Sequence, residues 1–259
     1  MWSTRKERGL SLPLVADLVL TTPELLQELE SGGCDPGLRI ARDLDRALNA
    51  GGELWNSWAS AHLAALFHSD RPPTITDALS EAFQVRAYAP LVLPDPYLTD
   101  SYAAALHRLE APMNLPLSTN APVEETGRLH PTTATTPHCL VVDEIALTRY
   151  LAPAEVLRAQ LLHLHHLAQQ DRVPATTGPH PGLRGAFWTL CYSPARTLVY
   201  TPHPCGTGHF HRESATVKAH TDLFATLQGV ALPAEDSLHR IAELAARLTP
   251  SPRQALTDH

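Results

Sequence analysis

The sequence predicts an α+β protein in which an N-terminal all-helical head is followed by an α+β body with short strands. Three observations lead to this fold class. Up to about residue 68, apolar side chains recur only at helical spacing, whereas beyond it helical segments alternate with short apolar runs typical of strands. A chain of 259 residues that is 44% hydrophobic is also long enough to bury a substantial core.

Each helix expected in the head has a start or a stop signal. Thr21 with Glu24 fits a capping box, and Thr22 with Pro23 fits a cap followed by proline in the first turn, so either pair can begin a helix. Glycine pairs at 32–33 and 51–52 indicate helix ends. The expected head helices cover residues 12–19, 22–30, 38–48 and 54–67.

Asp70-Arg71-Pro72-Pro73 is the best candidate linker, because two prolines and two charges follow the last head helix. We therefore expect a head at 1–69, a body at 74–248 and a loose tail at 249–259. The body should contain strands at 139–142, 186–192 and 197–201, an extended segment at 85–93, and a long loop at 112–137. Its helices should cover residues 75–83, 97–110, 153–170, 213–228 and 234–248, and Asp143 should cap a further helix.

Composition excludes some functional classes. The 27 acidic residues outnumber the 20 basic ones, which argues against a protein that binds mainly through phosphate contacts. No apolar run is long enough to span a membrane, and the four cysteines show no paired spacing, as expected for reduced thiols in the cytoplasm. The 23 prolines indicate frequent turns and helix ends.

An ordered series of features runs through the head: Gly9-Leu10-Ser11, the helix that follows, the short turn, the helix from Thr22 to Glu30, and Leu44-x-x-Ala47-Leu48. On these residues the head resembles the Xre-type helix-turn-helix of bacterial regulators, and compared with that family its first helix, the short segment at residues 2–8, is truncated. The resemblance implies that the second helix of the pair lies in the DNA major groove. Thr21, Thr22 and Gln27 are then the candidate DNA contacts.

A second ordered series runs through the body: Tyr88-Ala89-Pro90-Leu91-Val92-Leu93-Pro94, Val142-Asp143-Glu144-x-x-Leu147, Gln160-Leu161-x-x-Leu164, His180-Pro181-Gly182-Leu183-x-Gly185-x-Phe187 and Leu198-Val199-Tyr200. On these residues the body resembles the antitoxin-like C-terminal domain of actinobacterial regulators. The resemblance implies a cytoplasmic transcription regulator whose body senses a ligand or a partner. It further implies a small partner protein encoded nearby and a possible homodimer; no membrane association is expected.

The segment expected to enter the groove carries Glu24, Glu28 and Glu30 and no lysine or arginine. Three carboxylates near phosphates oppose DNA binding, so the sequence leaves open whether the DNA contact is retained or degenerate. The alternative is a repurposed regulator scaffold. It would act as an enzyme of specialised metabolism through histidine acid–base or metal chemistry, or as a protein-binding module.

The 15 histidines are unevenly distributed, and the densest group is His203, Cys205, His209 and His211. If Gly206 to Gly208 forms a turn, these four side chains project to one side and could hold a zinc-type divalent metal. The alternative is a polar loop, and without the metal we expect no cofactor. His163 and His166 lie opposite the apolar stripe of their helix and, with His180, could face solvent, a ligand or a partner.

Overall fold

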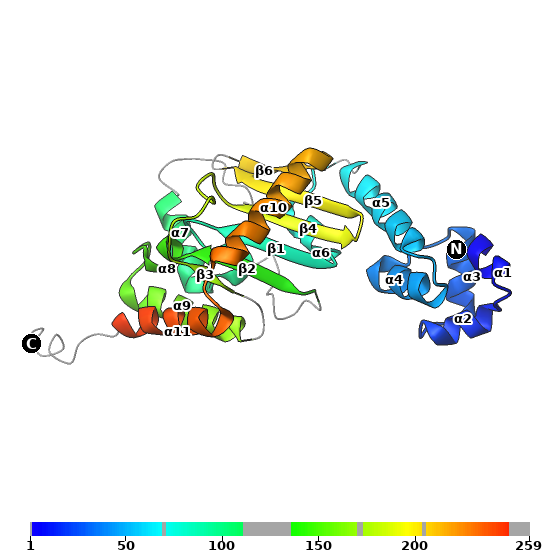
Figure 1. The fold of residues 1–259 in the computed structure, drawn as a ribbon, viewed down its shortest axis with the longest axis horizontal. Coiled ribbons are helices and arrows are strands. Elements are labelled where there is room, and N and C mark those ends of the chain that lie inside the picture. Colours follow the sequence, from blue (N-terminus) through cyan, green and yellow to red (C-terminus); the bar gives the residue numbers. More distant parts are fainter. Residues whose placement is uncertain (1, 69–70, 111–135, 170–172, 204–205, 249–259) are drawn as a thin grey trace, which may run out of the picture. The chain divides into compact units, whose positions relative to one another are not determined.

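The computed structural model describes residues 2–68, 71–110, 136–169, 173–203 and 206–248. Over these residues the predicted α+β class is confirmed: N-terminal helices precede a body built on a six-stranded sheet (Figure 1). The types of most elements therefore match those expected from apolar spacing. The predicted loop at 112–137 lies almost entirely outside the described residues, as do the predicted tail and Cys205.

The head consists of five helices in chain order: α1 (Trp2–Glu7), α2 (Leu12–Leu18), α3 (Pro23–Ser31), α4 (Gly37–Ala47) and α5 (Glu53–His68). Their ends follow local chemistry. The hydroxyl of Thr22 accepts a hydrogen bond from the Leu25 N–H at 3.2 Å, and Pro23 occupies the first helical turn, so the prediction of a cap followed by proline is confirmed. Gly32 ends α3 at φ +77°, a left-handed conformation that favours glycine.

A small apolar cluster joins the helices of the head. It is formed by the buried side chains of α2, α3 and α4 and of the residues at their ends: Val15, Ala16, Val19, Leu26, Leu44 and Leu48. The side chain of Asp45 is also buried, and its carboxylate accepts hydrogen bonds from the N–H groups of Gly52, Leu54 and Trp55 at 2.8–3.2 Å. One acidic side chain thereby satisfies the first N–H groups of α5.

The body begins with α6 (Ile75–Ser80) and contains both helices and strands. Its strands are β1 (Gln84–Ala89), β2 (His138–Asp143), β3 (Ala175–Thr176), β4 (Phe187–Ser193), β5 (Arg196–His203) and β6 (Gly206–His211). Its other helices are the short 3-10 helix η1 (Asp95–Tyr97), α7 (Asp100–Glu110), α8 (Glu144–Thr148), α9 (Ala154–Ala168), α10 (Ser214–Val230) and α11 (Ala234–Arg247).

The sheet has the strand order β3-β2-β1-β4-β5-β6. β1 and β2 pair in parallel, with Ala87 opposite Leu140, and β2 pairs in parallel with β3. β5 and β6 are antiparallel, with Val199 opposite His211. Parallel neighbours need crossover connections, and α7 and the α8–α9 pair lie in the two that join β1, β2 and β3.

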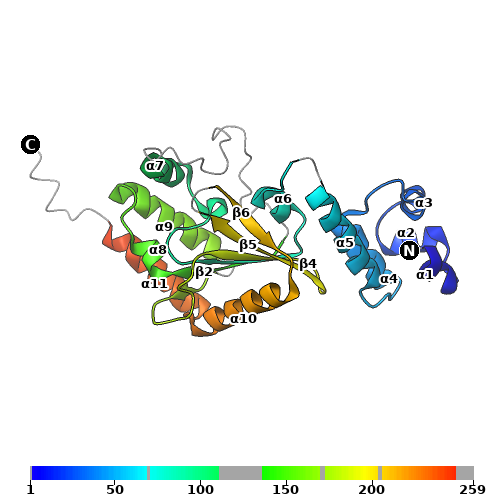
Figure 2. The same ribbon diagram turned by 90° about the horizontal axis from the view of Figure 1, so that it is seen from above.

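Helix α10 lies along one face of the sheet, and α7 and α9 lie on the opposite side (Figure 2). Under α10 an apolar cluster is formed by Tyr88, Cys139, Val141, Phe187, Phe224 and Leu227. A buried polar contact supports α9: the Gln160 side-chain amide donates to the Tyr97 carbonyl and accepts from the Thr99 N–H, both at 2.7 Å. Because both halves of this amide are paired, its burial leaves no polar group unsatisfied.

By their contacts the residues divide into two compact units, one of residues 1–84 with 190–198 and one of residues 85–189 with the chain from Val199 on. This division differs from the predicted border at 69–74. The reason is local: Trp55 of α5 donates its indole N–H to the Tyr192 carbonyl at 2.7 Å, and the Tyr192 hydroxyl donates to the Ala78 carbonyl at 2.5 Å. The end of the β4–β5 hairpin and α6 therefore group with the head helices.

Asp143 ends β2 and caps α8, as predicted: its Oδ1 accepts from the Ile145 N–H at 2.8 Å.

Two strands were not predicted in full. β3 is only two residues long and gives no periodic signal. β6 includes Gly206 and Gly208, so the turn that the metal hypothesis assumed at these glycines is absent: β5 ends at His203 and β6 already begins at Gly206. No helix in the described part of the chain is long and apolar enough to cross a membrane.

Candidate functional site

Helices α2 and α3 are consecutive and pack against each other through a shared apolar cluster. Only residues 19–22 separate them, and each helix begins at a capping hydroxyl, Ser11 for α2 and Thr22 for α3. Leu20 within the connection has a positive φ of 52°, which turns the chain sharply. Because Val15, Val19 and Leu26 are buried against one another, apolar packing fixes the second helix against the first.

The side chains predicted to contact DNA lie at the start and on the outer side of α3. Thr22 and Gln27 are exposed, and Thr21 is half-buried. The Thr22 hydroxyl already accepts the hydrogen bond that caps α3, so its remaining hydrogen is available for donation. Gln27 keeps its side-chain amide exposed, as a residue that reads base edges needs.

The negative charge that α3 presents to solvent is smaller than its three glutamates suggest, because Glu30 is neutralised by an ion pair with Arg5. Arg5 of α1 donates from Nε to Glu30 Oε1 at 2.7 Å and from Nη2 to Oε2 at 2.9 Å. The two side chains are 11% and 8% exposed, and the hydrogen bond to Glu30 raises the pKa of the Arg5 guanidinium. Glu24 and Glu28 remain exposed, so two rather than three carboxylates of α3 face solvent.

A cation from α4 lies beside the connection between α2 and α3. Arg39 donates from Nη1 to the Val19 carbonyl at 3.3 Å and lies 3.5 Å from Asp43, with 55% of its side chain exposed. No local pattern in the sequence points to this contact, because Arg39 lies 20 residues from its carbonyl partner. Because Asp43 shares its charge, Arg39 does not by itself offset the exposed carboxylates of Glu24 and Glu28.

In the body, Asp143 and His180 form a buried pair at the carboxyl end of β2. His180 Nδ1 accepts from the Gly182 N–H at 3.1 Å, so this nitrogen carries no proton and Nε2 donates to Asp143 Oδ2 at 2.7 Å. The side chain of His180 is 5% exposed and that of Asp143 is 15% exposed. This pair attaches the loop before β4 to the end of β2; the sequence predicted the cap made by Asp143 but not its contact with His180.

Tyr88 lies against the same loop. Its ring is 5.8 Å from that of His180, and a Cβ on Gly182 would lie 2.5 Å from its hydroxyl oxygen, so only glycine fits at position 182. Among the described residues the buried Tyr88 hydroxyl has no hydrogen-bond partner. Burial, together with the nearby Asp143 carboxylate, raises the pKa of Tyr88 to about 12.

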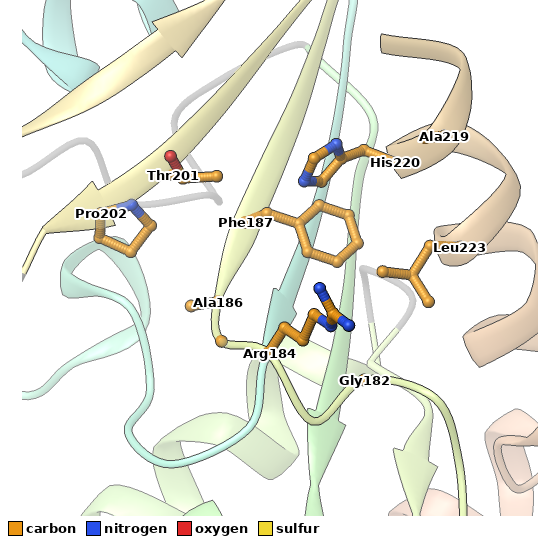
Figure 3. A pocket seen from close by; sticks show the side chains of 10 residues that line it. Gly182, Arg184, Ala186, Phe187, Thr201, Pro202, Ala219, His220 and Leu223 are labelled. Atoms are coloured by element: carbon orange, nitrogen blue, oxygen red, sulfur yellow. The ribbon is translucent and has the colours of Figure 1, made fainter. Parts of the chain in front are cut away.

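Next to Gly182 the surface is hollowed by a pocket of about 290 Å³ (Figure 3). Four segments supply its walls: the loop before β4, the start of β4, the end of β5 and helix α10. Its lining residues are Gly182, Arg184, Gly185, Ala186, Phe187, Thr201, Pro202, Ala219, His220 and Leu223. None of them is acidic.

One lining residue of the pocket, His220, belongs to a group of three histidine rings. The rings of His209 and His211 on β6 are 4.6 Å apart, and that of His220 on α10 stacks on His211 at 6.1 Å. Burial and then the neighbouring His209 and His220 lower the pKa of His211. His209 and His211 are neighbours in the sequence, whereas His220 reaches them only through the packing of α10.

The predicted metal ligands are only partly gathered. His209 and His211 lie together, His203 is exposed and pairs through its backbone with Gly206, and Cys205 lies outside the described residues. In the part of the chain that the structure describes, no group of three or more His, Cys, Asp or Glu side chains is arranged to hold a metal ion. The zinc-type site therefore stays a prediction of the sequence.

The histidines predicted to face a ligand or partner separate into different environments. His166 on α9 is exposed and His163 is half-buried. His180 is held by Asp143 and Gly182 as described, and it adjoins the pocket through Gly182.

Comparison with known proteins gives one match. No curated protein and no solved structure matches the chain. The sequence model of a domain of unknown function (DUF5753) matches residues 73–243, which is well over half of the chain and includes α6, the sheet, the Asp143–His180 pair and the pocket. The chain therefore belongs to the DUF5753 family.

Proposed function

We propose that this protein is a DNA-binding transcription regulator whose helix-turn-helix head contacts DNA through α3 and whose body senses a ligand or a partner protein. The observation that carries the proposal is the α2–α3 pair, in which four residues join two capped helices and Gln27 stays exposed on the second. A second helix presented in this way matches the geometry that places a recognition helix in the major groove.

The charge of the head supports a contact that is weaker than usual. Glu30 is paired with Arg5, and Arg39 lies beside the connection, but Glu24 and Glu28 remain exposed on α3. Since phosphate neutralisation by Lys and Arg supplies most non-specific affinity, we expect binding at low salt that weakens steeply as salt is added.

The direct test is fluorescence anisotropy of the full chain with a labelled duplex from the upstream region of its own gene. Binding at about 50 mM salt that decreases strongly by about 200 mM supports the proposal. A scrambled duplex of equal length measures the non-specific part. Absence of binding to either duplex at the lower salt would refute DNA binding by this head.

Two variants locate the contact on α3. Gln27→Ala should cost about 1–3 kcal/mol of discrimination between the native and the scrambled duplex if its amide reads a base. Combined Glu24→Gln and Glu28→Gln should instead tighten binding to both duplexes. At about 7 Å in water each carboxylate repels a phosphate by about 0.6 kcal/mol, so we expect roughly a five- to tenfold gain at low salt.

Glu53→Gln is the matched control, because Glu53 is exposed in the first turn of α5, outside the helix-turn-helix pair. It should change the affinity by much less than the two α3 substitutions. Equal effects of all three glutamates would mean that only the total charge matters and that α3 is not the contact.

A second function, an enzyme or binding module on the same scaffold, is favoured by the adjoining rings of His209, His211 and His220. Histidines supply acid–base groups and metal ligands near neutral pH. Metal analysis of the purified chain, with His209→Ala and His211→Ala as controls, tests the metal form of this function. Stoichiometric metal in the native chain that is lost in both variants would support a metal enzyme. A metal-free protein would exclude the metal enzyme and favour the binding module.

A further inference from the structure

The pocket beside Gly182 has a shape set by the backbone. Gly182 lies against the Tyr88 ring and Gly185 has φ +120°, so neither position accepts a side chain without strain. The His180–Asp143 pair fixes the Gly182 N–H from the other side. A loop held at these points keeps the wall of the pocket in place.

One end of the pocket carries an uncompensated positive charge. Arg184 lines the pocket and is exposed, and it forms no ion pair or hydrogen bond in the part of the chain that the structure describes. Its side chain extends toward Phe187 (Figure 3). Because none of the lining residues is acidic, nothing in the wall competes for its guanidinium. A carboxylate or phosphate group is the complement of such an arginine.

The rest of the wall is apolar except for two polar side chains, Thr201, whose hydroxyl is hydrogen-bonded to His211, and His220. Phe187 and Leu223 supply apolar surface, and the His220 ring packs edge-to-face against Phe187 at 5.1 Å. His220 Nδ1 donates to the Thr216 carbonyl at 2.9 Å, so in the neutral ring Nε2 is left as a hydrogen-bond acceptor. A ligand that offers a hydroxyl or an N–H could donate to it.

We propose that this pocket binds a small organic anion: a carboxylate or phosphate held by Arg184, on an apolar body that packs against Phe187 and Leu223 and donates a hydrogen bond to His220. A volume of about 290 Å³ is many times the roughly 30 Å³ that one water molecule occupies in the liquid, so it leaves room for a small organic molecule. The inference deepens the sensing half of the proposed function by giving the ligand class. It does not depend on DNA binding, and its test contains no DNA.

The probe is para-hydroxybenzoate, which has a carboxylate, a ring and a donor hydroxyl; its matched neutral control is para-hydroxybenzamide. Each is titrated into the full chain while NMR follows the histidine ring protons, and calorimetry gives the dissociation constant. We expect the carboxylate to shift the His220 signals and to bind at least about tenfold more tightly than the amide, as loss of a charge-assisted contact implies. Inorganic phosphate in place of the probe tests whether the anion alone suffices, and it should bind more weakly.

Arg184→Gln should weaken binding of para-hydroxybenzoate by about tenfold and bring it to the level of the amide. Arg158→Gln is the control, because Arg158 is an exposed arginine on α9, outside the pocket lining. Ala219→Phe, at an exposed position of α10 in the wall, should block the pocket without disturbing the core. Three results would overturn the proposal: no shift of His220, equal binding of acid and amide, or equal effects of Arg184→Gln and Arg158→Gln.

Discussion

Replacing Arg5 by Met tests whether α1 is attached to α3 by a charge pair that matters for stability. Arg5 donates two hydrogen bonds to Glu30, at 2.7 and 2.9 Å, and a third to the Leu10 carbonyl at 2.8 Å. The substitution removes all three and leaves the Glu30 carboxylate largely covered without a partner.

The loss in free energy of unfolding expected for Arg5→Met lies between two limits. Breaking a fully buried pair costs about 3–5 kcal/mol, whereas an exposed pair contributes about 0–1 kcal/mol. With side chains 11% and 8% exposed, the Arg5–Glu30 pair lies nearer the buried limit but still reaches water. We therefore expect Arg5→Met to lower the free energy of unfolding of the head by about 2–3 kcal/mol.

The assay is urea unfolding followed by tryptophan fluorescence, since Trp55 and Trp58 lie in α5 of the head. For a unit of this size, a slope of about 1 kcal/mol per molar urea converts the loss into a midpoint shift of about 2–3 M. The double variant Arg5→Met with Glu30→Leu should lose less than the sum of the single variants, by about 1–2 kcal/mol, because it leaves no unpaired charge.

Arg46→Met is the matched control in the same unit, because Arg46 is exposed on α4 and should cost less than about 0.5 kcal/mol. If Arg5→Met costs no more than this control, or if the double variant is simply additive, then the pair does not stabilise the head. Glu30 would then not be neutralised on α3.

Three further predictions concern buried polar groups. Gln160→Leu should lower stability by about 2–3 kcal/mol, because it leaves a buried carbonyl and a half-buried N–H unpaired; thermal denaturation measures this, with exposed Gln169→Leu as control. Asp45→Ala should cost about 2 kcal/mol and Asp45→Asn less, by the same urea assay, because asparagine keeps one acceptor oxygen for the N–H groups of α5. Tyr88→Phe should leave stability unchanged or raise it by up to about 1 kcal/mol, because it removes a buried hydroxyl without a partner among the described residues. It should also remove the absorbance change near pH 12 that marks ionisation of Tyr88, because the pKa of Tyr88 is raised to about 12. The contribution of neutral Tyr88 to the stability of the folded chain is complete below the unfolded pKa near 10 and is lost as pH rises toward 12.

The sequence by itself determined the features that depend on neighbours along the chain. Thr22 and Pro23 start α3, and Asp143 caps α8, because a capping side chain reaches N–H groups only two or three residues ahead. Apolar spacing in the same way identified α9, whose stripe of buried leucines follows the helical period. The α+β class and the helical head follow from such local signals.

Only the tertiary structure decided which distant side chains meet. Arg5 contacts Glu30 across 25 positions and His180 contacts Asp143 across 37. The ring of His220 reaches His211 because α10 packs against the sheet. No periodicity encodes these pairs, since they depend on where whole elements pack, and packing is set by the sum of many apolar contacts rather than by any local pattern. The charge on α3 and the pocket beside Arg184 therefore had to be found in the folded molecule.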